Sequence, residues 1–549
     1  MGKRLEIKAD VLIIGGGSAG CMAAIRAKEL NPDLDVVIFE KGDLKRGGSI
    51  AMGMDALNIV AVPGVDTPET YVDAASIAAD GILDQKPSHV MARRSYELMK
   101  KLESWGVRFT KDEKGQYIML KIHPRGKFYA AMDEPDLKVI LAGRVKKAGV
   151  RVLNRIMATS LLTEGGRVVG ATGLNIRTGD FVACLAKSVI LSSGGQARFT
   201  LPKSGYLYGT FDYPGNAGDG YAMAFRAGAQ LTGFEYTLCT PLIKDISCPL
   251  LYITLTRGAR VINARGELVG EEGNVSANVM MKEFLADRGP VFVKMDHLPE
   301  EKISEIEAIL FSTERPMQKR FFEQRGIDFR RAPIELHPTE FQLCGGHGLT
   351  GLVVDERAAT TLEGLYAAGD VACVPRQHLT GAFVFGEVAA ENAAARASIP
   401  WPDLPGEQVR AEEQRVFGPM QGGPSPIDLR EMEYKVRRIA GDYVVPPKNG
   451  YKLGQGIKWM QKFREELKDL KAADYHQLSK IQEIGFIIDC IELSAVASDA
   501  RKESRWGFYH YRTDYPEKND REWLKHIILQ KDESGGISVS FKPLERSVL

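Results

Sequence analysis

The sequence predicts an α/β fold in which a parallel sheet is interrupted by an inserted domain and followed by a helical carboxy-terminal region. Three observations support this fold class. A β-branched run near the amino terminus ends in closely spaced glycines, strand-and-glycine patterns return near residues 186–195 and 360–370, and the pattern is lost between about 233 and 335. Alternating buried strands and helices are typical of doubly wound sheets, so the two matching parts should share one sheet.

The first unit carries the most specific motif. Residues 11–14 form a continuous apolar run, which predicts a buried parallel strand. A helix is expected over 19–30 and a second strand over 35–39. In the turn between the first strand and the helix, Gly15, Gly17 and Gly20 have G-x-G-x-x-G spacing. These glycines permit a tight turn, close approach of the backbone to a pyrophosphate at the helix N-terminus, and close packing of helix on strand. Glu40 follows the second strand and can accept hydrogen bonds from ribose hydroxyls, so the unit predicts a Rossmann-like dinucleotide site.

Composition excludes several classes of protein. The 549 residues should divide into two to four domains, and 72 Lys and Arg balance 71 Asp and Glu, so no strong field favours nucleic acid. The seven cysteines are scattered without a C-x-x-C pair, which argues against an internal iron–sulfur module and a disulfide scaffold. No apolar run has transmembrane length and the polar start lacks a signal sequence, so we expect a cytoplasmic protein.

The remaining elements of the first half follow from periodicity and glycine spacing. The small-residue stretch 41–58 would let backbone amides approach a flat ligand, or would be a flexible loop. The segment 67–106 has helical periodicity, and the strand ending at 191 runs into SSGG at a second point where the sheet edge would meet the dinucleotide. We further expect a strand pair over 118–129, a helix over 135–148, strands over 150–153, 167–175 and 186–191, and a helix within 215–231.

The second half repeats the pattern. Strands are expected over 352–354 and 360–370, and a helix begins near Gly381. Asp370, at a strand's carboxyl end, could bind ribityl hydroxyls or could simply cap a helix, and the helix N-terminus near Gly381 could support negative charge on a flavin. Two dinucleotide elements that bracket an insertion favour FAD over NAD.

Beyond residue 400 the composition changes. A Pro/Gly-rich linker over 400–426 should lead into helices over 429–440, 450–472 and 475–498, and the charged end after residue 500 is expected to be a solvated surface. The expected domains are an FAD-binding domain in two parts (1–232 and 336–400), an α+β capping domain (233–335), and a helical domain with a charged tail (401–549). The candidate cofactor-binding residues are Gly15, Gly17, Ser18, Ala19, Gly20, Glu40, Lys41, Gly48, Ser49, Gly53, Gly194, Gly195, Asp219, Gly369, Asp370, Gly381 and Ala382.

Together these segments resemble the flavoprotein subunits of the succinate dehydrogenase and fumarate reductase superfamily. The resemblance rests on the amino-terminal motif, SVILSSGG, GLYAAGD and the carboxy-terminal SRWGFYHYRTDYP, which is similar to the family's SRGAHYRxDFP signature. It implies an FAD domain, a capping domain that closes over the flavin, and a helical carboxy-terminal domain. It also implies structural roles for Arg505 and His510.

The sequence departs from the family's dicarboxylate site. Thr240 and Phe341 stand in place of two histidines, the carboxylate-clamping arginine is replaced within QHLTG (377–381), and RGGS (46–49) lacks the histidine that binds FAD covalently. Loss of charge-assisted hydrogen bonds, each worth about 1.5–3 kcal/mol, makes succinate and fumarate poor substrates. The FAD should be noncovalent.

A closer resemblance is to the α subunit of adenylylsulfate reductase. RGGSIAMGMDALN, RAGAQLTGFEYTL and GGHG are similar to segments of that family. The resemblance marks His347, Lys244 and Asn58 as candidate catalytic residues, and Arg257 stands where the superfamily has a proton-donating arginine, although it could instead form a surface ion pair. His337, His378 and His123 are weaker candidates.

The resemblance implies redox chemistry of a small anionic substrate at flavin N5, with electrons exchanged through a ferredoxin-like iron–sulfur subunit. Alternatives are a fumarate reductase-, succinate dehydrogenase- or aspartate oxidase-like enzyme with another substrate, and a noncatalytic flavoprotein subunit that relays electrons. Neither nucleic acid nor a metal ion bound by the chain is expected.

Overall fold

A seven-stranded sheet forms the centre of the protein. The computed structural model describes residues 2–52, 56–121, 123–132, 136–202, 212–245, 251–255, 257–270, 277–314 and 317–549. The sheet order is β6 (Arg151–Asn154), β2 (Val36–Glu40), β1 (Arg4–Ile14), β9 (Phe181–Leu191), β8 (Arg167–Asn175) and β7 (Ile156–Glu164), and β16 (Leu365–Ala367) also pairs with β9.

The strands that carry the predicted motifs are parallel and end at one edge. Ile14 pairs with Phe39 and with Leu191, and Ala367 also pairs with Leu191. Because parallel strands present their carboxyl ends together, the loops after β1, β2, β9 and β16 converge. The prediction that both halves of the chain build one sheet is confirmed.

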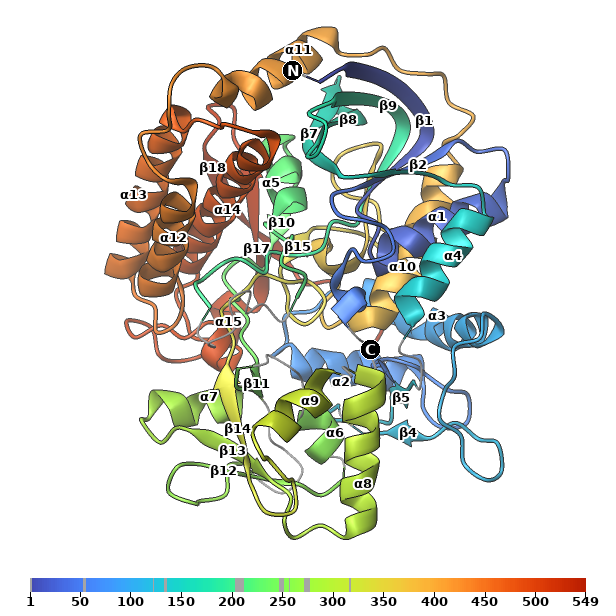
Figure 1. Ribbon diagram of the computed structural model, residues 1–549, viewed down its shortest axis with the longest axis vertical. Helices are drawn as coiled ribbons and strands as arrows, with labels where there is room; N and C mark the ends of the chain where they lie inside the picture. Colours follow the sequence, from blue (N-terminus) through green and yellow to red (C-terminus); the bar gives the residue numbers. More distant parts are fainter. Residues whose placement is uncertain are drawn as a thin grey trace.

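Helices cover this sheet closely. α1 (Ser18–Leu30) and α10 (His378–Ala394) pack on one another, α4 (Leu137–Lys147) lies beside α1, and α5 (Asp219–Arg226) contacts β7. α1 buries eight of its residues, most of them Ala, Gly or Cys, so its small side chains allow the backbones to approach. Figure 1 shows these helices beside the blue and teal strands.

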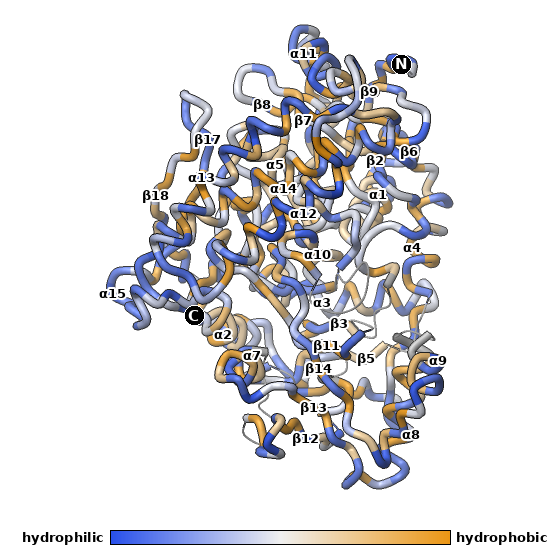
Figure 2. The backbone as a smooth tube through the Cα atoms, turned by 60° about the vertical axis from the view of Figure 1, so that its left-hand side comes forward, coloured by the Kyte–Doolittle hydropathy of each residue, from blue (hydrophilic) through white to orange (hydrophobic). Residues whose placement is uncertain are grey.

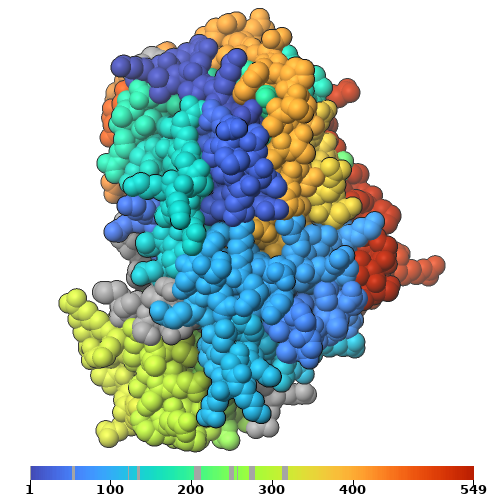
Figure 3. Space-filling view, turned by 90° about the vertical axis from the view of Figure 1, so that its right-hand side faces the viewer, coloured from blue at the N-terminus to red at the C-terminus, as the bar shows by residue number. Residues whose placement is uncertain are grey.

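Residues 241–338 form a separate layer with its own core. The sheet order is β11 (Pro241–Ile243), β14 (Ile334–Pro338), β13 (Val291–Lys294) and β12 (Arg260–Ile262), all antiparallel. Short helices flank it: α6 (Leu251–Leu255), α7 (Ala277–Leu285), α8 (Glu300–Ala308) and α9 (Met317–Gln324). Figure 1 shows this cap as the yellow-green lower part of the molecule. Figure 3 shows the light-blue segment that contains α3 (Gln85–Ser104) between the cap and the amino-terminal strands.

The carboxy-terminal helices share the main core. α12 (Leu429–Ile439), α13 (Gly450–Glu466) and α14 (Tyr475–Ala500) pack together, and α14 also contacts α5. Two strands, β17 (Lys525–Lys531) and β18 (Ile537–Pro543), extend a second sheet through β10 (Leu231–Thr232) and β15 (Gly351–Leu352). In Figure 2, α15 (Asp520–Trp523) and the ends of the carboxy-terminal helices are hydrophilic at the outside. Among the described residues no helix combines the length and the apolar character needed to span a bilayer.

Several predicted elements are wrong in their extent. The helix expected over 67–106 is two helices, α2 (Pro68–Ala78) and α3, because Asp80 and Gly81 have φ of 50° and 86°. The helix expected within 215–231 is present as α5, whereas the one expected over 450–472 ends with α13 at Glu466. The linker over 400–426 contains α11 (Gly406–Phe417), and β3 (Ala56–Leu57) joins the predicted strand pair, β4 (Met119–Leu120) and β5 (Tyr129–Ala131).

The charged end of the chain is only in part the solvated surface that we expected, because Glu517, Arg521 and Glu522 are exposed but several arginines are buried. Arg501, Arg505 and Arg512 are 0 %, 1 % and 0 % exposed. Arg501 pairs with Glu235 and Glu503, and Arg505 pairs with Glu503 through two hydrogen bonds. Burial is possible because each guanidinium has a carboxylate partner, and breaking such pairs is costly.

The contact of α1 with α10 provides a stability test. A Cβ added at Gly386 would lie 2.5 Å from the carbonyl oxygen of Ala19, whereas one added at Gly454 of α13 would meet nothing within 4 Å. We expect Gly386→Ala to cost about 1–3 kcal/mol through overpacking, and Gly454→Ala to stabilise by about 0.5–1 kcal/mol through helix propensity. Thermal unfolding followed by circular dichroism checks this. Equal shifts of the melting temperature in both variants would refute the close contact.

Candidate functional site

The glycine turn after β1 leads directly into the N-terminus of α1, which faces a cleft. Gly15 has φ of 101° and donates its N–H to the carbonyl of Phe39 at 2.8 Å. Gly17 is the extended N-cap of α1 and no side chain caps that helix. A Cβ at Gly17 would meet only the Cα of Gly48, at 4.0 Å. The first N–H groups of α1 are therefore left for a ligand, as anion binding at a helix N-terminus requires.

The cleft at this edge is lined by most of the predicted cofactor residues. The predicted residues that line it are Gly15, Gly17, Ser18, Ala19, Glu40, Lys41, Gly48, Ser49, Gly194, Asp219, Gly369, Asp370 and Ala382. Its glycine-rich wall lets a ligand approach the backbone closely. The lining residues that were not among the predicted cofactor-binding residues are Ile14, Gly16, Phe39, Ile50, Ile156, Ala158, Ser192, Ser193, Tyr213, Asn216 and Met223.

Three predicted cofactor residues lie outside the lining and instead allow close packing. A Cβ at Gly20 would lie 1.9 Å from the carbonyl oxygen of Gly15, one at Gly195 would lie 2.4 Å from that of Leu343, and one at Gly381 would lie 2.2 Å from the Cβ of Gln377. These glycines therefore do not face the ligand, and instead allow the segments behind the cleft wall to pack closely. Gly53 lies outside the described residues.

Glu40 is buried at the base of the glycine turn. Its carboxylate accepts hydrogen bonds from the N–H groups of Gly16 at 2.8 Å and Gly42 at 2.7 Å. The carboxylate thus fixes the turn, and its contact with a ribose stays a prediction. Ser193, which also lines the cleft, has a buried hydroxyl with no hydrogen-bond partner among the described residues, so a polar group of the ligand can satisfy it.

A buried ionic network ties the cleft to the carboxy-terminal helices. Lys41 Nζ lies 2.7 Å from Asp219 Oδ2 and 3.1 Å from Glu483 Oε1 of α14. Glu483 also accepts from Arg198 at 2.8 Å. Burial by itself would lower the pKa of Lys41, but the two carboxylates raise it above its ordinary value, so the lysine stays charged.

Asp370, which lines the cleft, interacts with a second buried carboxyl group, that of Asp212. Burial, and then the charge of Asp212, raise the pKa of Asp370 to about 7, and burial raises that of Asp212 to about 6. Two buried like charges disfavour one another, so the pair holds a proton near neutral pH. A protonated carboxyl can donate to a hydroxyl oxygen, which suits the predicted role of Asp370 toward a ribityl chain.

Beyond Asp370 lies a cluster of three histidines, defined here as the histidine cluster: His123, His347 and His378. His347 Nδ1 is 3.2 Å from His378 Nδ1, and the ring centroids of His123 and His378 are 6.5 Å apart. His123 Nε2 lies 2.9 Å from the carbonyl oxygen of Asn58, so Asn58, a predicted catalytic residue, contacts the cluster through its backbone. The cluster adjoins the cleft, because a Cβ on Gly346 would lie 2.0 Å from Asp370 Oδ1.

Arg376 supplies the positive charge of this region. Its Nη1 donates to the carbonyl of His347 at 3.5 Å, its Nε is buried without a partner, and no carboxylate among the described residues pairs with it. Arg376 and His378 have φ of 61° and 49°, and such backbone strain is typical of functional sites. Burial first and Arg376 second lower the pKa of His347 to about 4, and burial chiefly does the same for His123, so both imidazoles are neutral at pH 7.

The sequence predicts that the carboxylate-clamping arginine is replaced within QHLTG (377–381), and Arg376 directly precedes that segment. Arg376 was not among the predicted site residues, because it lies one position before the segment that resembles the family's arginine motif. The available signal was its place in the polar PRQH run immediately before α10, at the carboxyl edge of the sheet.

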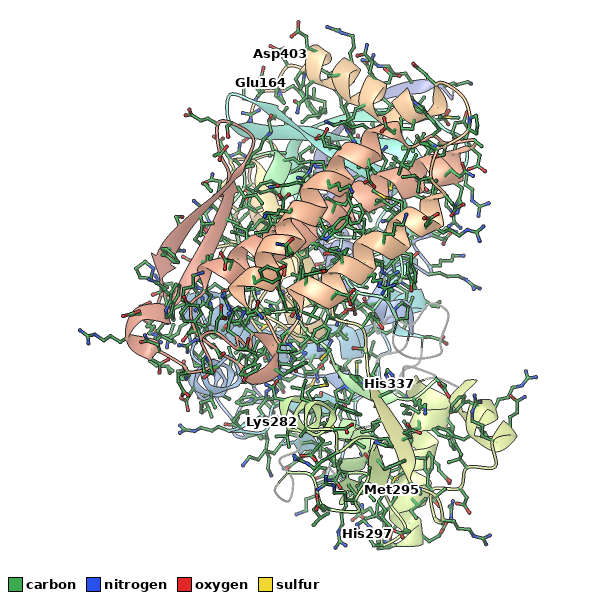
Figure 4. All side chains as sticks on the ribbon, turned by 90° about the vertical axis from the view of Figure 1, so that its left-hand side faces the viewer. Glu164, Lys282, Met295, His297, His337 and Asp403 are labelled. Atoms are coloured by element: carbon green, nitrogen blue, oxygen red, sulfur yellow. The ribbon has the colours of Figure 1, made fainter. Side chains whose placement is uncertain are left out.

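The two cations predicted as catalytic lie in the cap. Lys244 Nζ is 2.8 Å from Glu335 and its side chain is 42 % exposed, and Arg257 donates to Glu305 and to the carbonyl of Ile253, each at 2.9 Å. Both positive charges are balanced by carboxylates, and their catalytic roles stay predictions. His337 lies on β14 where the cap meets the body, whereas His297 lies at the far end of the cap (Figure 4).

The two positions that replace the family's histidines bear no charge. Thr240 and Thr339 exchange hydrogen bonds of 3.0 Å, and the ring of Phe341 packs on that of Phe508 with centroids 5.7 Å apart. Neither Thr240 nor Phe341 supplies a cation to hold a carboxylate.

The raised pKa of Asp370 predicts a pH dependence of stability. Between its unfolded value of 3.8 and its native value of about 7, the native state keeps a proton that the unfolded state releases. The free energy of unfolding therefore falls as the pH rises through this window. Asp370→Asn should make this fall shallower, which urea unfolding of the cofactor-free protein at several pH values can measure. The exposed Asp33→Asn is the control, and parallel profiles for wild type and Asp370→Asn would contradict the assignment.

Comparison with known proteins agrees with this geometry. Residues 10–381 match the FAD binding domain family, and residues 433–549 match the family described as fumarate reductase flavoprotein C-term. One subunit of the fumarate reductase (CoM/CoB) of Methanothermobacter marburgensis is 27% identical, covering 95% of this chain and 97% of the relative.

Solved structures show the same fold. Adenylylsulfate reductase from Archaeoglobus fulgidus superposes with a TM-score of 0.91 at 24% identity, covering 100% of this chain and 97% of that one. A variant of E. coli quinol fumarate reductase gives 0.83 at 20% identity, with 99% and 98% covered. The glycine turn, the open end of α1 and the orphan Ser193 hydroxyl fit FAD. The chain belongs to the FAD-binding flavoproteins of the succinate dehydrogenase and fumarate reductase family, and is an FAD-dependent oxidoreductase.

Proposed function

We propose that this flavoprotein exchanges electrons between FAD and a small anionic substrate held by Arg376. The observation that carries the proposal is the Arg376 guanidinium, which has no carboxylate partner among the described residues and lies beside neutral histidines. A charge in such surroundings is costly unless an anion accompanies it. An anionic substrate would supply the missing partner.

The position of Arg376 supports a substrate next to the cofactor. His378, two residues later, opens α10, and Ala382 on the same helix lines the cleft. Tyr71 donates its hydroxyl to the carbonyl of Arg376 at 3.2 Å, which helps to hold the strained loop. Bound FAD supplies two-electron transfer at the flavin ring. The residues of this chain orient the substrate and handle its protons.

Among the described residues of this region, Arg376 is the one cation without a carboxylate partner, which favours a substrate with one anionic end over a dicarboxylate. The uncharged Thr240 and Phe341 support this preference, because neither supplies a positive charge to pair with a second carboxylate. Adenylyl sulfate stays a candidate through the similarity of Asn58 and His347 to residues of adenylylsulfate reductase. The FAD is proposed to be noncovalent, the protein to act in the cytoplasm, and a ferredoxin-like iron–sulfur subunit to exchange electrons with it.

The proposal is tested by reoxidation of the FAD-loaded protein after anaerobic reduction. Adenylyl sulfate, fumarate and the monocarboxylate crotonate are added in turn, and return of the flavin absorption is followed. We expect one of the singly anchored anions to react faster than fumarate. If none reoxidises the flavin, the chain is better described as an electron-relay subunit.

Arg376→Gln separates anion binding from folding. Loss of a charge-assisted contact worth about 1.5–3 kcal/mol should raise the half-saturating concentration of the reacting anion about 10- to 100-fold. Sulfite, a small anion that bleaches oxidised flavins, is a second probe that needs no turnover. Arg331→Gln, at a cap side chain that is 87% exposed, is the matched control. Unchanged affinity for both probes in Arg376→Gln would refute the role of Arg376.

A further inference from the structure

The histidine cluster contains one direct contact between two rings. His347 and His378 face one another through their Nδ1 atoms at 3.2 Å, with ring centroids 4.8 Å apart and planes at 75°. A hydrogen bond between two imidazole nitrogens needs one N–H and one lone pair. If both rings are neutral, they are therefore opposite tautomers joined by a single proton.

The surroundings keep both rings neutral. Burial and the neighbouring Arg376 charge lower the pKa of His347 to about 4; burial, His347, Arg376 and His123 together lower that of His378 well below its ordinary value. An imidazolium here would place a second positive charge beside Arg376. A single histidine acting as a preformed general acid would thus be scarcely populated at pH 7.

The backbone holds the pair in place. His378 donates its backbone N–H to the carbonyl of Gly346 at 3.0 Å, and the backbone N–H of His347 donates to Cys344 Sγ at 3.4 Å. His378 is 9 % exposed and adopts a left-handed φ, so its ring position is set by tertiary structure. No residue in the described part of the chain forms a hydrogen bond with His378 Nε2, which leaves this atom for a substrate.

We propose that His347 and His378 form a relay that passes a proton to or from the substrate while both rings stay neutral. This inference rests on the proposed function. A substrate carbon that receives a hydride leaves the adjacent carbon in need of a proton, which His378 Nε2–H donates. His378 Nδ1 then takes the proton from His347 Nδ1, and His347, which is partly exposed, takes one at Nε2 from solvent.

The step balances in atoms and charge. The substrate gains two electrons and two hydrogens, one as the hydride and one as the proton from solvent through the relay. Each ring loses one proton and gains another, so the pair ends neutral with its tautomers exchanged. Proton exchange with solvent at the two Nε2 atoms resets it, and oxidation of a substrate runs the same steps in reverse.

The state of the pair can be measured without a substrate. Among nine histidines in the chain, long-range ¹⁵N NMR of the FAD-loaded protein labelled at histidine identifies each ring's tautomer, and His347→Gln and His378→Gln assign the two signals. We expect two neutral rings of opposite tautomer at pH 7. A charged ring, or two rings of the same tautomer, would overturn the relay.

The relay itself is tested by the rate of reoxidation in mixtures of H₂O and D₂O, with the anion that reoxidises the reduced flavin. Wild type should give a curved proton inventory because more than one proton moves. His347→Gln should be slower and give a linear one, and His378→Gln should lose about 10²- to 10⁴-fold in rate. Both variants should bind sulfite with the affinity of the wild type. His476→Gln, at a histidine on the first turn of α14, is the control and should give the rate and the proton inventory of the wild type.

Two results would overturn the relay. One is a linear inventory in wild type; the other is a reacting anion, such as adenylyl sulfate, whose rate is indifferent to both substitutions. If no anion reoxidises the flavin, the proposed function fails, and the NMR measurement still decides whether the two rings share a proton.

Discussion

The close approach of backbone segments at the carboxyl edge of the parallel sheet is the constraint on which this structure depends. Gly20 lets α1 lie against the carbonyl of Gly15, and Gly386 lets α10 lie against α1. A side chain at either glycine would force the helix away from its neighbour. Because the helices sit so close, the open end of α1 and Ala382 of α10 border a single cleft.

The cleft and the histidine cluster that adjoins it differ in their electrostatics. On the cofactor side, charges are paired or protonated: Lys41 lies between carboxylates, and Asp370 shares its surroundings with Asp212. In the adjoining histidine cluster, Arg376 stands beside neutral imidazoles. In a buried site, an incoming anion gains most where a positive charge is not already balanced. Under the proposed function, this asymmetry would place a neutral ribityl chain in one region and the anionic substrate in the other.

The carboxy-terminal helices take part in this arrangement. Glu483 of α14 reaches Lys41 at the cleft, and Arg501 and Arg505 bury their charges against Glu235 and Glu503. The tail looked like a solvated surface in sequence because composition counts charges without showing which ones meet. Long-range pairing over more than 260 positions, as between Glu235 and Arg501, has no local signature.

Local pattern alone was enough to identify β1, the glycine turn, α1 and Glu40, since their spacing reflects backbone geometry within one unit. It also located Asp370 and the small residues at the start of α10, because the end of a strand and the start of a helix can be recognised from neighbouring residues alone. Only the tertiary structure brought His123, His347 and His378 together and left Arg376 without a carboxylate among the described residues. Those properties depend on which distant segments converge, and on how burial and a neighbouring charge change a pKa, which no window of sequence contains.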